Sequence, residues 1–305
     1  MSVLIIGSVA LDSIETPAGR LEAAQGGSAS YASVAASYWS QPSVVAVIGD
    51  DYPPAYLELL RSRGVSLEPG LEVVKGGRSF HWSGLYKGAM NEAITRQTEL
   101  GVFAHFNPKV PAELKQSRFV LLGNIDPDLQ LSVLDQIEKP ELVVVDTMNL
   151  WIDIKRAELL KVLGRADVIV LNDGEARLLG EQISLHRCAE FLMNEVGARY
   201  VIIKKGEHGA NLYGRDLYFS LPAFPVKELK DPTGAGDSFA GGFIGYLSRQ
   251  PEVNLSSLKR AMVVGTVMAS FCVETFSLGY SGHLTPEKIA SRIYAMREIT
   301  HFDAI

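Results

Sequence analysis

The chain has 305 residues, of which 47% are hydrophobic and 21% are charged, and its formal net charge is −6. This size allows one large α/β domain with a small attachment, and no block of like charges points to a nucleic-acid or anionic-membrane partner. The two cysteines, Cys188 and Cys272, fit neither a disulfide framework nor a zinc site, so a reducing cytoplasm is the expected compartment. The longest uncharged apolar stretch, residues 261–273, is shorter than the about 20 residues that a membrane helix needs.

The N-terminal region predicts a buried strand at residues 3–6, followed by a Gly-Ser turn and then by Asp12. An acid just past the end of a first buried strand lies where open α/β sheets bind ligands, although a solvated loop aspartate is the simpler interpretation of this residue alone. Gly26 and Gly27 precede a helix rich in small residues that extends to about Ser40. Two glycines before a helix allow a substrate to approach the backbone closely.

The segment between residues 65 and 106 is less regular, because glycines and polar turns interrupt short β-like runs. These runs are Leu71–Val74, Arg78–Tyr86 and Ala93–Thr98. Phe80, Trp82 and Tyr86 fall on one face of the second run. The three aromatic side chains either pack on the sheet beneath them or cover a substrate and stack on it. Stacking would favour a nucleoside over a plain sugar.

From Phe119 onward, buried strands alternate regularly with helices. The expected strands are Phe119–Leu122, Leu142–Asp146, Val168–Leu171 and Tyr200–Lys204, and the expected helices are Leu129–Ile137 and Ala157–Leu163. This alternation predicts a parallel sheet whose strand ends form the rim of a site. Asn172 and Glu175 follow one strand, where Asn172 could also cap the next helix. Asp146 and Asn149 are weaker candidates for the same rim.

A turn with two glycines, Gly206 and Gly209, follows the strand that ends at Lys204. The lysine could reach phosphate oxygens, or it could be an exposed lysine at a strand end. The sequence leaves both roles open.

The most informative stretch is Asp231–Phe243, which begins as a glycine-containing turn and continues with the spacing of a helix. The turn from Thr233 to Gly236 therefore leads into a helix N-terminus, where unpaired N–H groups and the helix dipole make an anion site. Asp237 lies in the same turn and would repel a bound phosphate. A carboxylate beside an anion site is useful if it takes a proton from an alcohol while the site stabilises a phosphoryl group in transfer.

Motifs of other chemistries are absent from the sequence: there is no P-loop, no G-x-G-x-x-G, no G-x-S-x-G and no H-E-x-x-H. A dinucleotide oxidoreductase is therefore not expected. Any kinase chemistry must depend on the turn that carries Asp237.

The string D-P-T-G-A-G-D followed by S-F-A-G-G-F resembles the C-terminal signature of the PfkB, or ribokinase-like, family of carbohydrate and nucleoside kinases. The resemblance extends from Asp12 to the C-terminal helices. It implies an α/β ribokinase-like fold in one domain, residues 1–305, with a central, mostly parallel sheet flanked by helices. A small, reduced β lid would come from about residues 12–26 and 70–100. The implied cofactors are ATP and Mg²⁺, while a monovalent cation and a homodimer stay open.

The resemblance also implies roles for individual residues in transfer of the γ-phosphate of ATP to a hydroxymethyl group. The catalytic base would be Asp237. The anion hole would be formed by Gly234, Ala235 and Gly236. The residues that hold the acceptor would be Asp12, Gly26 and Gly27. The nucleotide contacts would be Lys204, Gly206, Gly209 and Thr233. The residues that position Mg²⁺, through water, would be Asn172 and Glu175.

Two departures from the family pattern bear on the acceptor. The family often has Asn four residues after the second glycine, where this chain has Tyr31, so an amide that would bond sugar hydroxyls is missing. The stretch between Asp12 and Gly26 is also shorter than in many sugar kinases of the family. A sugar or sugar-like acceptor is the first expectation, and a nucleoside is the alternative. A non-catalytic ligand-binding member is a third hypothesis, which the presence of Asp237 disfavours.

Overall fold

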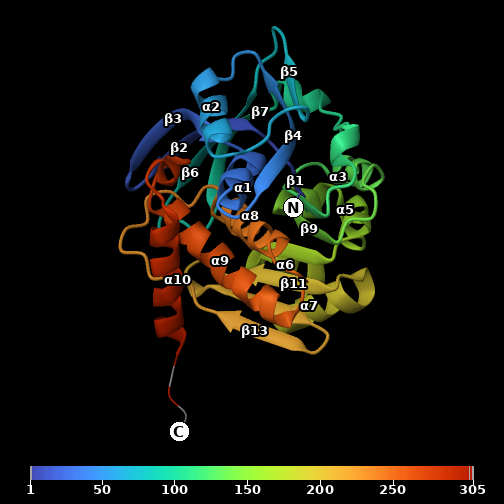
Figure 1. The fold of residues 1–305 in the computed structure, drawn as a ribbon, viewed down its shortest axis with the longest axis vertical. Coiled ribbons are helices and arrows are strands. Elements are labelled where there is room, and N and C mark those ends of the chain that lie inside the picture. Colours follow the sequence, from blue (N-terminus) through green and yellow to red (C-terminus); the bar gives the residue numbers. More distant parts are fainter. Residues whose placement is uncertain (1, 302, 304–305) are drawn as a thin grey trace.

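The computed structural model describes residues 2–301 and residue 303. In this part of the chain, nine strands form one sheet in the order β13-β12-β11-β10-β9-β8-β1-β4-β5 (Figure 1). The strands are β1 (Ser2–Ile6), β4 (Gln41–Gly49), β5 (Leu71–Val74), β8 (Phe119–Leu122), β9 (Leu142–Asp146), β10 (Val168–Asn172), β11 (Tyr200–Lys204), β12 (Ala210–Gly214) and β13 (Leu217–Leu221). The strands from β11 to β5 are parallel, whereas β12 and β13 continue the sheet antiparallel. The sheet agrees with the predicted, mostly parallel architecture.

Helices cover both faces of the large sheet (Figure 1). One layer contains α1 (Ser28–Ala36), α2 (Pro54–Ser62), α8 (Ala235–Ser248), α9 (Leu255–Val273) and α10 (Pro286–Thr300). The other layer contains α3 (Pro127–Leu134), α4 (Asn149–Ile154), α5 (Arg156–Leu163), α6 (Asp173–Gly180) and α7 (Leu185–Phe191). Parallel strands need such crossover helices, which bury both faces of the sheet.

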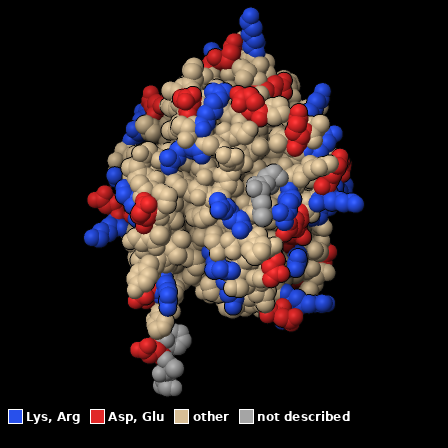
Figure 2. Space-filling view, viewed as in Figure 1, with Lys and Arg blue, Asp and Glu red and all other residues tan. Residues whose placement is uncertain are grey.

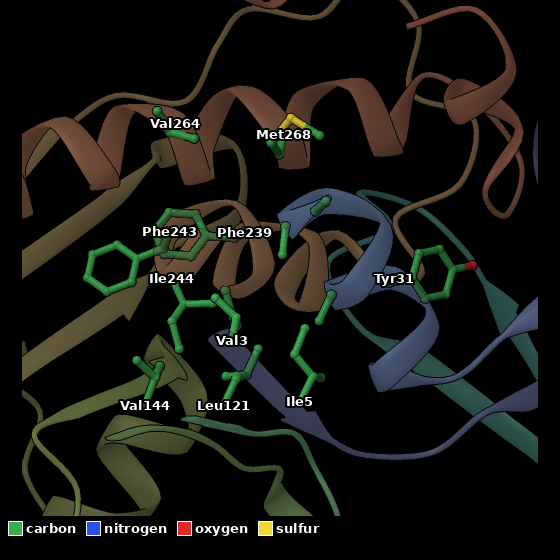
Figure 3. Close-up of a cluster of buried hydrophobic side chains, with 14 of the residues drawn as sticks. Val3, Ile5, Tyr31, Leu121, Val144, Phe239, Phe243, Ile244, Val264 and Met268 are labelled. Carbon is green, nitrogen blue, oxygen red and sulfur yellow. The ribbon is translucent and has the colours of Figure 1, made fainter. Parts of the chain in front are cut away.

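The strands supply side chains to both layers, because successive residues of a strand point to opposite faces. Val3 belongs to the core under α1, α8 and α9, and Leu4 belongs to the core on the other face. In Figure 3, Phe243 and Ile244 of α8 lie between the strands and Met268 of α9. Helix α8 is therefore fixed between the sheet and α9, and its N-terminal turn has a rigid support.

A second sheet has four strands in the order β3-β2-β6-β7, namely β2 (Ala10–Thr16), β3 (Gly19–Gly26), β6 (Phe80–Tyr86) and β7 (Ala93–Glu99). Asp12 lies inside β2 and is buried, so the simpler interpretation of this residue alone, a solvated loop aspartate, is wrong. Leu71–Val74, predicted to belong to the lid, is instead β5 and pairs with β4 at the edge of the large sheet. The segment that follows β5 leads into the small sheet.

Helix α3 begins at Pro127, two residues earlier than predicted, because the side chain of Asp126 caps it by accepting from the N–H of Asp128. On the face drawn in Figure 2, acidic and basic side chains are interspersed and separated by uncharged surface. Among residues 2–301, no helix combines the length and the apolar character that crossing a membrane requires.

Candidate active site

Helix α8 begins with a turn that exposes its backbone N–H groups. Gly234 precedes the helix with a φ of 74°, in the left-handed region that glycine favours. The buried carboxylate of Asp231 fixes the turn, since it accepts from the N–H of Thr233 at 2.9 Å and from the N–H of Ser277 at 3.1 Å. The N–H groups of the first helical turn, which include those of Gly236 and Asp237, have no intrahelical acceptor. A helix start of this kind is suited to hold an anion, and the anion site at this turn stays a prediction.

The ring of Tyr31 packs against this turn. Tyr31 lies in α1 and is 1% exposed, and Figure 3 shows its ring at one side of the cluster of buried side chains. A Cβ atom added to Gly234 would clash with the ring of Tyr31. The tyrosine at the position where the family often has Asn thus packs against the anion-binding turn.

We expect Gly234→Ala to lower both activity and stability. The new methyl group would meet the Tyr31 ring in a backbone conformation that L-residues rarely adopt, at a combined cost of about 1–3 kcal/mol. The measurements are the melting temperature and the rate of ADP release. Gly282→Ala is the matched control, because a Cβ atom at Gly282 meets open space. Equal behaviour of the two variants would contradict the close packing of the turn.

Asp237 lies in the first turn of α8 and is only partly accessible to solvent. Burial, together with the negative charge of Asp146, raises the pKa of the Asp237 carboxyl to about 7, while the ammonium of Lys204 opposes this rise. A carboxyl group with a pKa near the working pH can accept a proton and release it again. The position and the pKa both suit a general base.

Lys204, at the end of β11, lies against the same turn. Its Nζ atom would be 2.8 Å from a Cβ atom added to Gly236, and it is 3.5 Å from Oδ1 of Asp146. Lys204 is also in register with Asn172 of the neighbouring strand β10. The predicted nucleotide-binding lysine and the predicted metal-binding segment are therefore adjacent.

Asn172 and Glu175 form a capping box at the start of α6. Oδ1 of Asn172 accepts from the N–H of Glu175 at 2.8 Å, and Oε2 of Glu175 accepts from the N–H of Asn172 at 2.7 Å. Glu175 is 7% exposed, and burial raises the pKa of its carboxyl to about 7 against the effect of Lys204. The helix-capping role that the sequence left open for these two residues is confirmed.

The donor set at this position fits a Mg²⁺ ion that keeps most of its water. Within the described residues, no group of three or more His, Cys, Asp or Glu side chains is placed to enclose a metal. One oxygen of Glu175 and one of Asn172 are used by the capping box, which leaves few direct ligands. Mg²⁺ commonly binds through one or two carboxylates together with water and substrate phosphates, and this arrangement is compatible with that mode.

Asp12 approaches the site from the small sheet and is 4% exposed. A Cβ atom added to Gly26 would clash with the Asp12 carboxylate, and one added to Gly27, where φ is 92°, would clash with the carbonyl of Ser8. The two glycines are therefore required for the close approach of β2, β3 and α1. Burial and the charges of Asp231 and Asp237 raise the pKa of Asp12 to about 7, although the N–H of Gly27 lowers it.

The small sheet contacts two of the predicted nucleotide-binding segments. The hydroxyl of Thr233 donates to the hydroxyl of Tyr86 at 3.2 Å, which joins β6 to the turn before α8. In the second turn, Gly206 and Gly209 both have positive φ values, and a Cβ atom at Gly206 would lie 3.1 Å from Oδ1 of Asn91. Asn91 belongs to the loop between β6 and β7. The small sheet thus lies over the edge where the predicted site residues meet.

The three aromatic residues of β6 have different surroundings. The ring of Phe80 stacks on the ring of Phe103, with 5.4 Å between the ring centroids, so it packs within the protein. Trp82 lies beside Asp12, its register partner in β2. The apolar cluster against which Trp82 packs consists of Ile14, Tyr86 and Met90. An aromatic and apolar surface therefore adjoins the buried carboxylate of Asp12.

The two weaker candidates from the sequence, Asp146 and Asn149, have different surroundings in the structure. Asp146, a weak candidate from the sequence, ends the buried strand β9 and contacts Lys204. Asn149 is exposed in α4, and its side chain accepts from the N–H of Leu150. The sequence indicates that Asp146 is the last residue of a buried strand. The position of this strand beside β10 follows only from the sheet order.

These features together define a class of enzyme. A helix N-terminus that can hold an anion lies next to a partly buried carboxyl group whose pKa is raised to about 7. Buried acids, a lysine and a capping box surround it at the ends of parallel strands. Such an arrangement is suited to transfer of a phosphoryl group to an alcohol.

Comparison with known proteins agrees with this class. Residues 2–283 match the family described as pfkB family carbohydrate kinase. A cytidine kinase of Thermococcus kodakarensis is 30% identical over 260 residues, which are 82% of this chain and 89% of that protein. The chain therefore belongs to the pfkB family and is an ATP-dependent kinase.

Solved structures show the same fold at low sequence identity. A nucleoside kinase of Burkholderia thailandensis, in complex with inosine, aligns with a TM-score of 0.77 and 20% identity over 96% of each chain. A ribokinase II from E. coli, in complex with ATP and Mg²⁺, aligns with a TM-score of 0.78 and 18% identity over 96% of this chain and 99% of the other. The fold predicted from the sequence, the ribokinase-like fold, is confirmed.

Proposed function

We propose that this kinase transfers the γ-phosphoryl group of Mg·ATP to the hydroxymethyl group of a nucleoside. The observation that carries the choice of a nucleoside is the pairing of Asp12 with Trp82 in neighbouring strands. A buried carboxylate accepts hydrogen bonds from ribose hydroxyls, and an indole ring beside it offers a surface for a base. The similarity to a cytidine kinase supports the same choice.

The proposed mechanism uses the residues that surround the start of α8. Asp237 takes the proton of the acceptor hydroxyl as its oxygen attacks the γ-phosphorus atom, and ADP leaves. The predicted anion hole is Gly234, Ala235 and Gly236. Because the N–H of Ala235 donates to the carbonyl of Pro232 at 3.2 Å, the oxygens of the phosphoryl group would be bound mainly by the N–H groups that follow it, beginning with Gly236. Asp12, Gly26 and Gly27 hold the acceptor. The nucleotide lies along Thr233, Lys204, Gly206 and Gly209.

Asn172 and Glu175 would hold Mg²⁺ through water, and the ion, when bound, neutralises charge on the phosphate oxygens. The same assay run with K⁺ and with a bulky organic cation tests whether a monovalent cation is also needed. A rate that depends on K⁺ would place this chain among cation-requiring kinases.

We expect a nucleoside to be phosphorylated in preference to the corresponding free sugar. The test is ADP release from Mg·ATP with cytidine, inosine and adenosine compared with ribose and fructose. In Trp82→Ala the KM for the nucleoside should rise roughly five- to hundredfold, because stacking on an aromatic side chain is worth about 1–3 kcal/mol per base. The KM for ATP should stay within about twofold.

Trp39→Ala is the control for the removal of a tryptophan, since Trp39 follows α1 and lies outside the small sheet. A free sugar that is used better than every nucleoside, with no effect of Trp82→Ala on its KM, would contradict the nucleoside assignment and leave the kinase assignment intact.

A further inference from the structure

Lys204 occupies an unusual position for a basic side chain. It ends β11, its side chain is only 19% exposed, and its Nζ atom lies beside Gly236 in the first turn of α8. The N-terminal end of a helix carries partial positive charge. An ammonium group at this end is repelled by the helix dipole and is costly to bury unless an anion compensates it.

The resting protein compensates this charge with acids from three other elements. Asp146 ends β9, Glu175 lies in α6 and Asp237 lies in α8. Burial alone would lower the pKa of Lys204, but the charges of these acids, Asp146 first, outweigh it and raise the pKa. Lys204 is therefore an ammonium ion in the folded protein.

The hydrogen bonding of this ammonium is incomplete. An ammonium group has three donors. Among the described residues, the acceptor found for Lys204 is Oδ1 of Asp146, at 3.5 Å, which is longer than the about 2.7–2.9 Å of a strong charge-assisted hydrogen bond. Asp146 is itself held in place, because its Oδ1 atom also accepts from the N–H of Thr147 at 3.0 Å. Two donors of Lys204 are thus available next to the N–H groups of the anion-binding turn.

We infer that Lys204 directly binds the phosphoryl group under transfer, and that Asp146 is the positioning residue that keeps its ammonium beside the first turn of α8. This inference rests on the proposed function and deepens it, because a general nucleotide contact does not specify which phosphate is bound. An anion in the turn would accept hydrogen bonds from the backbone N–H groups and from the Lys204 ammonium together. It would complete the hydrogen bonding of Lys204 and offset the repulsion between the ammonium and the helix dipole.

A purely structural role for Lys204 makes a different prediction. If Lys204 only neutralises Asp146 and Glu175, its loss should destabilise the protein and weaken the binding of all adenine nucleotides to the same extent. If Lys204 binds the phosphoryl group in transfer, its loss should weaken the binding of ATP selectively. The dependence on the number of phosphates therefore separates the two roles.

The experiment is calorimetric titration of the intact protein with AMP, ADP and ATP in the presence of Mg²⁺. In Lys204→Met, ATP affinity should fall roughly ten- to hundredfold relative to the affinities for ADP and AMP, the range expected for one hydrogen bond to a charged group. Lys205→Met is the matched control and should bind all three nucleotides like the wild type. In Asp146→Asn, the ATP affinity should fall less than in Lys204→Met. The double variant should equal Lys204→Met, because Asp146 acts through Lys204.

Unchanged ATP affinity in Lys204→Met, or a loss for ATP that is matched by an equal loss for ADP or for AMP, would overturn the inference. AMP binding reports whether each variant is folded, and Lys204→Gln provides a second variant if Lys204→Met is unstable. Wild-type protein that fails to bind ATP would instead overturn the proposed function. The two failures are therefore distinguishable.

Discussion

Asp237→Asn is expected to lower the rate of phosphoryl transfer by about a thousandfold or more, whichever acceptor proves best, since positioned general bases contribute about 10²–10⁴-fold. An amide has the shape of the carboxylate but cannot take the proton of the hydroxyl group. ATP binding should be retained or improved, because the variant lacks a negative charge beside the phosphates. The measurements are single-turnover ADP formation and ATP affinity.

The pH dependence of the wild-type rate follows from the same residue. Because burial raises the pKa of Asp237 to about 7, the base is protonated on the acid side of this value, and the rate should fall there. The raised pKa also affects stability. The folded state binds more protons than the unfolded state between the usual value of 3.8 and about 7, so this carboxyl group makes the protein less stable as the pH rises through that range. At pH 8, Asp237→Asn should therefore melt no lower than the wild type.

The control for Asp237→Asn is Asp216→Asn, in the exposed turn between β12 and β13. It should change neither the rate nor the pH profile. A rate of Asp237→Asn within about tenfold of the wild type would exclude Asp237 as the base.

The second large effect is expected at Asp12. Asp12→Ala should raise the KM of the acceptor by about a hundredfold or more, since each hydrogen bond to a charged group is worth about 1.5–3 kcal/mol and a ribose can donate two. The KM of ATP should change little, because Asp12 belongs to the small sheet and is proposed to hold the acceptor and not the nucleotide. Steady-state kinetics with each substrate varied in turn provide the measurement.

Glu15→Gln is the matched control on the same strand, because the side chain of Glu15 is 38% exposed and pairs with Arg96. An exposed ion pair of this kind contributes little, so the control should resemble the wild type. A rise in the KM of ATP without any change in the KM of the acceptor would contradict the assignment of Asp12 to the acceptor.

The parts of the site that depend on local chain chemistry could be predicted from the sequence. The glycines of Asp231–Phe243 dictate a turn at a helix start, and Asn172 with Glu175 spells a capping box. In both cases the residues that make the structure are within a few positions of one another. The alternation of buried strands and helices likewise predicts the parallel sheet.

The parts that depend on distant contacts could not be predicted. The β2–β3 hairpin is hard to recognise because much of β3 is exposed and polar, so Asp12 seemed to follow a strand in a loop. Lys204 and Asp146 meet although β10 lies between their strands, and only the sheet order brings them together. Phe80 shares a face with Trp82 in the sequence pattern, but its packing against Phe103 depends on a segment outside the strand.

We propose that this chain makes a phosphate ester at the hydroxymethyl group of a nucleoside, with Asp237 as the base. The most direct measurement is identification of the product formed from Mg·ATP and a nucleoside, by mass spectrometry and phosphorus NMR, together with the amount of ADP released. We expect one nucleoside 5′-phosphate for each ADP released. Phosphate on a ring hydroxyl, or ADP released without any ester, would contradict it.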